Sequence, residues 1–275
     1  AGNVFSDLIR SGRVAEVSLR EIFRQAECSA IVRNAHAVNE GRLPALDNDQ
    51  GDFFFLRRRD PVRAADTIVE LVKSRLPDRM GIPADQIQVL TPTHHGEAGT
   101  FRLNQALQEA LNPRRPDRRE RVWGDRLFRE GDRIMQTKND YDVVWEKADG
   151  TVGTGMFNGD VGRIEQIDPS GEWVTVNFDD RLATYTADQL SEIDLSYAMT
   201  VHKAQGSEYR CVVIASVNAA PGLMVRGVLY TAMTRARELL ILVGDEGAVA
   251  RMTENDRRQK RYSGLKWRLR GGKSA

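Results

Sequence analysis

A short polar string in the C-terminal half of the sequence holds side chains that could bind phosphate. Residues 196–209 read SYAMTVHKAQGSEY, and they bring hydroxyl, imidazole, ammonium, amide and carboxylate groups close together at Thr200, His202, Lys203, Gln205 and Glu208. Gly206 interrupts the string, and a glycine allows the backbone to approach a ligand closely. A glycine turn between two core strands would account for the flanking apolar residues, but not for this polar series. The string therefore predicts a site for phosphate or another polar ligand.

A second block carries two arginines close behind the first. Residues 228–243, VLYTAMTRARELLILV, indicate a short helix that carries Arg235 and Arg237, followed by a buried strand. Two residues apart on a helix, the two guanidinium groups would point to different sides, so both could not bind one phosphate. The alternative is a solvated arginine helix without a chemical role.

In this order and at this spacing, TVHKAQGSE and YTAMTRAR resemble motifs V and VI of the superfamily 1 helicases, most closely those of the RecD-like branch. The resemblance implies that Arg235 is the catalytic arginine finger, which stabilises charge on the transferring phosphoryl group of ATP. It implies a salt bridge, or a link to motif V, for Arg237.

The same resemblance divides the polar string between two ligands. Gly206 and Glu208 would face the nucleotide as cofactor-binding residues. Thr200, His202 and Lys203 would bind single-stranded DNA through its backbone phosphates, which positions a strand without reading its sequence.

The elements that must position these residues are typical of an α/β fold. The apolar run 211–217 indicates a buried parallel strand. Residues 87–90 indicate another strand, and the loop TPTHHGEAG and a helix follow, which is the layout of an α/β unit with a ligand loop. This block resembles motif IV, which implies that His95 binds the nucleotide, although arginine or lysine would be a stronger phosphate partner there. The pair His94 and His95 has no third ligand nearby, so no metal site is predicted.

The periodicity changes from Trp123 onward. Short strands separated by tight turns are predicted at 132–137, 161–167, 172–178 and 183–186, which is typical of a small antiparallel barrel. The RecD-like family carries an SH3-like barrel, subdomain 2B, inserted at this place. The resemblance therefore implies a second RecA-like domain, without a P-loop, formed by residues 51–122 and 195–250 and interrupted by the barrel at 123–194.

Four further segments have predictions of their own. Residues 1–50 form a helical segment that would lead from a first motor domain, with helical patterns at 4–10 and 19–39. Residues 112–121, NPRRPDRRER, form a basic linker, either near DNA or merely solvated. The basic tail 251–275 could pack on the surface, touch DNA or lack order. Arg57–Arg59 indicate a solvated edge or a phosphate contact, ahead of a helix that begins with Asp60 and Pro61.

The P-loop half of a helicase motor is not recognisable in this sequence. The only Gly-Lys-Ser string, at 272–274, has Trp267 where a P-loop needs its first glycine, and no helix can follow it. Residues 242–246, LVGDE, imitate an acidic pair but fit the end of the last strand better. We therefore expect a piece of a longer protein that is inactive as an ATPase alone, with the main site for ATP and Mg²⁺ in a missing first domain.

The composition sets limits on location and partners. The net charge of +1 means that contacts with nucleic acid must come from local patches. Cys28 and Cys211 are far apart in the sequence and have no metal-ligand spacing, which favours a reducing, cytoplasmic setting. No apolar run approaches the roughly 20 residues of a membrane span, and no membrane partner is expected.

The resemblance implies an ATP-dependent 5′–3′ DNA helicase that acts in DNA repair and recombination. Its expected partners are single-stranded DNA, the N-terminal RecA-like domain of the same protein and, if it belongs to a nuclease complex, the other subunits of that complex. The sequence leaves open a free RecD-like helicase, a nuclease-complex subunit and a relaxase-helicase. A different class of function, a stand-alone module that binds nucleic acid or protein without ATPase activity, also stays open.

Overall fold

A five-stranded parallel sheet forms the centre of the larger unit. The computed structural model describes residues 4–17, 29–49, 51–257 and 264–271. Every neighbouring pair in the sheet is parallel. The strand order is β1 (Phe53–Arg57), β14 (Ala236–Gly244), β13 (Tyr209–Ser216), β2 (Ile87–Thr91) and β12 (Ala198–Thr200). This sheet confirms the predicted α/β class, and β2 and β13 confirm the two strands predicted from the apolar runs.

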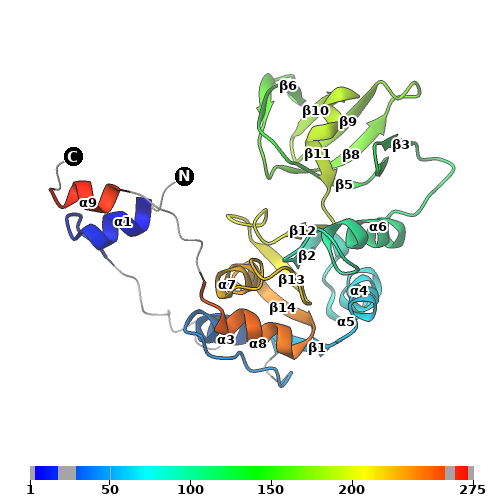
Figure 1. Ribbon diagram of the computed structural model, residues 1–275. Helices are drawn as coiled ribbons and strands as arrows, with labels where there is room; N and C mark the ends of the chain where they lie inside the picture. Colours follow the sequence, from blue (N-terminus) through cyan, green and yellow to red (C-terminus); the bar gives the residue numbers. More distant parts are fainter. Residues whose placement is uncertain (1–3, 18–28, 50, 258–263, 272–275) are drawn as a thin grey trace.

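Helices cover both faces of the sheet because the central strands are apolar on both sides (Figure 1). In β13, Val213 belongs to one core cluster and Val212 to the other, as alternation along a strand requires. The first cluster includes residues of α4 (Pro61–Glu70) and α6 (Thr100–Leu111). The second includes residues of three helices: α3 (Ala30–Asn39), α7 (Arg226–Met233) and α8 (Glu246–Glu254).

The helix that begins with α4 follows its sequence signals closely. The Asp60 carboxylate accepts a hydrogen bond from the backbone N–H of Val62, and Pro61 occupies the first turn, as predicted. The helix continues through a π-helical stretch, Leu71–Arg75, into α5 (Leu76–Met80). It ends at Gly81, whose φ of 62° is a left-handed conformation that glycine adopts without strain. The whole element runs from Pro61 to Met80.

A seven-stranded antiparallel sheet, together with a hairpin, forms the inserted unit, which we call the antiparallel unit (Figure 1). The hairpin consists of β3 (Glu120–Trp123) and β4 (Arg126–Arg129). The sheet contains β5 (Arg133–Gln136), β6 (Asp140–Lys147), β7 (Val152–Met156), β8 (Val161–Ile167), β9 (Trp173–Phe178), β10 (Arg181–Thr186) and β11 (Ile193–Leu195).

The four predicted strands of this unit are confirmed as β5, β8, β9 and β10. The sequence did not predict β6, β7 or the hairpin, and β3 begins inside the stretch expected to be a linker. The alternation that reveals a strand is weak in β6, where four of the eight residues are charged. A 3₁₀ turn, Asp188–Glu192, leads into β11 and returns the chain to the parallel sheet.

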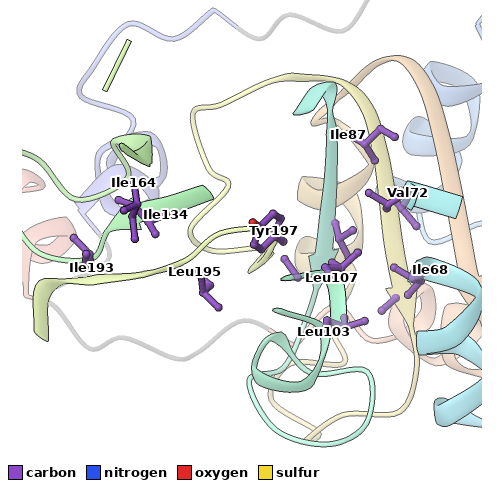
Figure 2. Packing of buried hydrophobic residues seen from close by; sticks show 14 of the residues in the cluster. Ile68, Val72, Ile87, Leu103, Leu107, Ile134, Ile164, Ile193, Leu195 and Tyr197 are labelled. Atoms are coloured by element: carbon purple, nitrogen blue, oxygen red, sulfur yellow. The ribbon is translucent and has the colours of Figure 1, made fainter. Parts of the chain in front are cut away.

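One continuous core joins the two units (Figure 2). Ile134 and Ile164 of the antiparallel unit belong to the same buried cluster as Leu103 and Leu107 of α6. Tyr197, in the link between β11 and β12, belongs to it as well. The antiparallel unit therefore packs on the parallel sheet instead of being tethered by two loose connections.

The two ends of the described chain meet away from both sheets (Figure 1). Helix α1 (Val4–Ser11) confirms the predicted first helix, and α9 (Leu265–Leu269) lies beside it. The Arg270 guanidinium donates to the carbonyl of Arg10 at 2.8 Å. The tail that was expected at 251–275 thus contains the end of α8 and a helix that contacts α1. Of the helix predicted at 19–39, only α3 is described, because residues 18–28 lie outside the described residues.

Cys211 lies fully buried in β13, and burial raises the pKa of its thiol to about 12. The thiolate is the reactive form, so almost none is present at pH 8. We expect iodoacetamide to leave Cys211 unlabelled in the folded protein and to label it in denaturant, as measured by mass spectrometry of the peptide that contains it. Labelling at equal rates in both conditions would contradict this burial.

Within the described residues, no helix has both the length and the apolar character needed to cross a membrane.

Candidate nucleotide and nucleic-acid sites

The polar string runs from the carboxyl edge of the parallel sheet to its amino edge. Thr200 ends β12 level with Thr91 of β2, whereas Tyr209 begins β13 level with Ala236 of β14. Because these strands are parallel, Thr200 lies at the carboxyl edge of the sheet and Glu208 at the amino edge. Residues 201–208, which we call the crossing segment, connect the two edges through turns in which the Lys203 N–H donates to the Thr200 carbonyl at 3.0 Å. The structure thus separates the residues expected to meet DNA from those expected to meet the nucleotide.

Arg235 joins the crossing segment at the amino edge. Its guanidinium donates to the backbone carbonyls of Ser207, at 2.9 Å, and Thr231, at 3.1 Å, and to the Thr234 hydroxyl at 3.2 Å. All three acceptors are neutral, and Arg235 has no ion pair among the described residues. Its half-buried positive charge therefore lies beside the exposed Glu208 and Gly206 without a carboxylate bound to it. Gly206 has a φ of 87°, a conformation that suits glycine.

The expectations for the two arginines need one correction. Helix α7 ends at Met233, so neither arginine lies on it as predicted. Arg235 follows the helix, and Arg237 is already in β14. Arg237 is exposed, and no described residue forms a salt bridge with it or links it to the crossing segment. Arg235 makes that link instead, because the chain leaves the helix before residue 235 and turns its side chain toward Ser207.

The carboxyl edge holds Thr200, His202 and Lys203, but they differ in access to solvent. Thr200 is only 6% exposed, so its hydroxyl presents little surface to a ligand. His202 is exposed, and Lys203 is half-buried. Burial lowers the pKa of Lys203, while the nearby Asp194 carboxylate raises it and Arg126 lowers it further. Of the three residues that the sequence predicts to bind DNA, His202 and Lys203 therefore have the more accessible side chains.

His95 lies at the same carboxyl edge, in the loop after β2. Ile87 of β2 and Leu239 of β14 both lie level with Cys211 of β13. Arg235 comes before Leu239 and Thr91 comes after Ile87, so about eight residues, or roughly 25 Å, separate them along the strand direction. The structure therefore places His95 at the edge that carries His202 and Lys203 and does not bring it to Arg235, against the sequence-based expectation of a shared nucleotide site. The reason is that β2 is parallel to β14, so the end of one strand cannot meet the start of the other.

The neighbouring His94 is held in place more firmly than His95. Its Nδ1 lies 3.0 Å from the Thr100 hydroxyl at the start of α6. Burial lowers the pKa of His94, and the charges of Lys203 and His95 lower it further. The described part of the chain contains no cluster of three or more potential metal ligands.

A buried carboxylate fastens the antiparallel unit to the parallel sheet. Asp132 is fully buried, and its Oδ1 accepts from Asn112 Nδ2 at 2.7 Å and from the Tyr197 hydroxyl at 3.0 Å. Its Oδ2 accepts from Gln108 Nε2 at 2.5 Å and from the backbone N–H of Arg129 at 2.7 Å. Burial raises the pKa of Asp132, against the four donated hydrogen bonds, which lower it. One side chain thus connects the C-terminal end of α6, the hairpin and the link between β11 and β12.

Arg133 makes a second connection on the amino-edge side. Its guanidinium donates to the Gln88 side chain at 2.8 Å and to the Ile87 carbonyl at 3.3 Å. Burial lowers the pKa of Arg133. It lines a hollow of about 620 Å³ that also borders Arg163 and Glu208, so the antiparallel unit faces the crossing segment directly. Sequence reasoning missed Asp132 and Arg133; the only signal was two adjacent charges at the start of a predicted strand.

Two family models match the chain. Residues 103–178 match the SH3 domain of ATP-dependent RecD-like DNA helicases. Residues 195–243 match the UvrD-like helicase C-terminal domain. The first match includes most of α6 and most of the antiparallel unit, and the second includes the crossing segment, Arg235 and most of β14.

Two known proteins of the same family are similar to this chain in sequence. An ATP-dependent RecD2 DNA helicase of Deinococcus radiodurans is 32% identical over 232 residues, which are 84% of this chain and 29% of that protein. The RecBCD enzyme subunit RecD of Mycolicibacterium smegmatis is 30% identical over 186 residues, which are 68% of this chain and 30% of that protein. The chain thus spans less than a third of the length of either relative.

Among solved structures, Bacteroides Pif1 bound to single-stranded DNA aligns with a TM-score of 0.49 and 17% identity, covering 84% of this chain and 53% of that one.

Proposed function

Since the chain belongs to the RecD-like branch of the superfamily 1 helicases, we propose that it is the part of an ATP-dependent 5′–3′ DNA helicase that supplies the arginine finger and contacts to single-stranded DNA. ATP and Mg²⁺ are held chiefly by a P-loop domain with which this chain works. The chain alone is inactive as an ATPase.

The observation that carries the proposal is the state of Arg235 at the amino edge. Its guanidinium is fixed by three neutral acceptors, and its charge has no carboxylate partner among the described residues. A fixed cation of this kind stabilises the charge that develops on a γ-phosphate when a second domain presents the nucleotide. Gly206 and Glu208 lie at the same edge and would face the sugar and phosphates.

The crossing segment suggests how nucleotide and DNA are coupled. It starts at Thr200, close to His202 and Lys203, and ends beside Glu208 and Arg235. A nucleotide that draws Arg235 toward a P-loop domain would pull on Ser207 and, through about eight residues, on the DNA contacts. Closing and opening of the two domains would then move the chain along single-stranded DNA.

The remaining roles follow from the same proposal. His95, at the carboxyl edge, acts with the DNA contacts and not with the nucleotide. The partners are single-stranded DNA, a P-loop domain and, in a nuclease complex, further subunits. The setting is cytoplasmic, in DNA repair and recombination.

Two assays on the chain test this proposal. We expect the chain alone to bind an oligothymidylate, and His202→Ala with Lys203→Gln to weaken that binding about tenfold, the size of one or two lost charge-assisted contacts. Arg237→Gln, which removes an exposed charge at the other edge, is the control. We expect no ATP hydrolysis, with or without the oligonucleotide.

Each assay can overturn a different part of the proposal. DNA-stimulated hydrolysis by the chain alone would mean that it holds a complete nucleotide site. Binding that the His202 and Lys203 changes leave intact would move the DNA site elsewhere. DNA binding together with no turnover, even after a P-loop domain of a RecD-like helicase is added, would favour a stand-alone binding module.

A further inference from the structure

Four arginines surround a hollow where β1 ends and α4 begins. The hollow measures about 540 Å³, and it is lined by Arg57, Arg58, Arg59, Asp60 and Arg63. A surface with one carboxylate among four guanidinium groups attracts an anion.

The charges around this hollow are only partly neutralised. Arg57 pairs with Glu246 of α8. Arg58 donates to two neutral acceptors, the Thr67 hydroxyl at 2.9 Å and the carbonyl of Arg57 at 2.8 Å.

The other two guanidinium groups are freer. Arg63 lies 3.9 Å from Asp60, whose carboxylate already caps α4. The Arg59 side chain has no hydrogen bond or ion pair with any described residue, and it is exposed. A bound anion would therefore meet Arg59 and Arg63 without having to displace a tight ion pair.

The hollow lies at the carboxyl edge of the parallel sheet, the edge that also carries His202 and Lys203. Arg57 is level with Gly244, Gly244 is level with Ser216, and all the strands run in one direction. Four strand spacings separate β1 from β12, so the hollow lies about 19 Å along this edge from the end of β12. One extended strand of DNA could touch both places.

We propose that the Arg57–Arg63 hollow binds a backbone phosphate of single-stranded DNA that has crossed the carboxyl edge from His202 and Lys203. Arginine suits this role because its planar fork binds two phosphate oxygens at once. The amino end of α4 adds a favourable dipole. The contact reads no sequence, because it reaches only the backbone. This inference rests on the proposed DNA site at the carboxyl edge and extends it.

The test compares two double variants of the full chain that remove the same charge. Arg59→Gln with Arg63→Gln removes the two freest guanidinium groups of the hollow. Arg75→Gln with Arg79→Gln is the control, because both arginines are exposed and lie toward the other end of the same continuous helix. Fluorescence anisotropy measures the affinity for oligothymidylates of increasing length, at several salt concentrations.

We expect the Arg59 and Arg63 variant to lose about tenfold in affinity for long oligothymidylates. Its slope of log affinity against log salt should be smaller by roughly 0.7 for each lost phosphate contact. Oligothymidylates too short to reach from His202 to the hollow should bind both variants and the unmodified chain equally well. The control variant should match the unmodified chain at every length.

Three results would overturn the inference. The affinity for long oligothymidylates and its salt slope could be unchanged in the Arg59 and Arg63 variant. The control variant could lose as much affinity, which would indicate a general charge effect. Inorganic phosphate could stabilise the unmodified chain against heat but not the Arg59 and Arg63 variant, while the two proteins bind DNA with equal affinity. The hollow would then bind a free phosphate. In all three cases binding that depends on His202 and Lys203 would leave the proposed function intact, whereas loss of all DNA binding by the unmodified chain would remove both.

Discussion

Replacing Arg235 by alanine should lower ATP turnover about 10³-fold or more in a motor that joins this chain to a P-loop domain. The affinity for ATP should change little, because the finger acts mainly on charge that develops in the transition state. Single-turnover hydrolysis, measured beside equilibrium binding of a fluorescent ATP analogue, separates the two effects. Arg235→Lys should recover only part of the rate, since an ammonium keeps the charge but loses the fork that binds Ser207 and Thr231.

Arg237→Ala provides a matched control for this experiment. It removes the same charge two residues farther along, from an exposed side chain without a described partner. We expect a turnover close to that of the unmodified motor. Equal losses in the two variants would mean that the amino edge needs only positive charge, and an unchanged rate in Arg235→Ala would remove the finger from Arg235.

The contrast between these two arginines shows what the sequence can and cannot predict. The string YTAMTRAR was sufficient to select Arg235 by resemblance. It did not reveal that α7 stops at Met233, and the geometry that had been assigned to the two arginines depended on that helix. The residue at which a helix ends depends on the packing around it. The sequence could therefore indicate Arg235 as the important residue, but not whether Arg235 lies on the helix or after it.

Strands were predictable where burial imposes a regular pattern. The apolar run in β13 is buried on both faces, and the alternation in β9 and β10 marks one buried face. Strand β6 lacks such a pattern, because charged side chains occupy both of its faces. Its place is set by pairing with β10 and β7, which are contacts distant in sequence.

The position of His95 illustrates a limit of another kind. Its loop has the composition of a ligand loop, and the sequence correctly predicts a strand before it and a helix after it. Which edge of the sheet the loop occupies follows from the direction of β2 relative to β14. That direction is a property of the whole sheet, so the residues around His95 could not reveal it.

The contacts that join the two units could not be predicted from the sequence either, and they affect how the two units should move in the motor. Asp132 gathers donors from residues 108, 112, 129 and 197, and the buried cores of the two units are continuous. Because these contacts hold the two units together, we expect them to rotate as one rigid body. The antiparallel unit should therefore move with the parallel sheet whenever the crossing segment responds to nucleotide.

Replacing Asp132 by asparagine should lower the free energy of unfolding by about 3 kcal/mol. Each carboxylate oxygen accepts two hydrogen bonds, so an amide nitrogen in either position would face two donors and leave them unpaired in the core. Tyr197→Phe removes a single donor and should cost only about 1 kcal/mol. Urea unfolding at neutral pH, followed by circular dichroism, measures both changes.

Asp180→Asn is the control for the same chemical change on the surface of the antiparallel unit. Its carboxylate is exposed and pairs with the Lys147 ammonium on the surface, so we expect an unchanged unfolding midpoint. If Asp132→Asn left the midpoint equally unchanged, the joint would contribute little to stability.

In a complete motor, a folded Asp132→Asn variant should hydrolyse ATP at a near-normal rate but unwind less DNA for each ATP, because the antiparallel unit would no longer follow the parallel sheet. Normal unwinding for each ATP would show that the motor does not need this rigid connection.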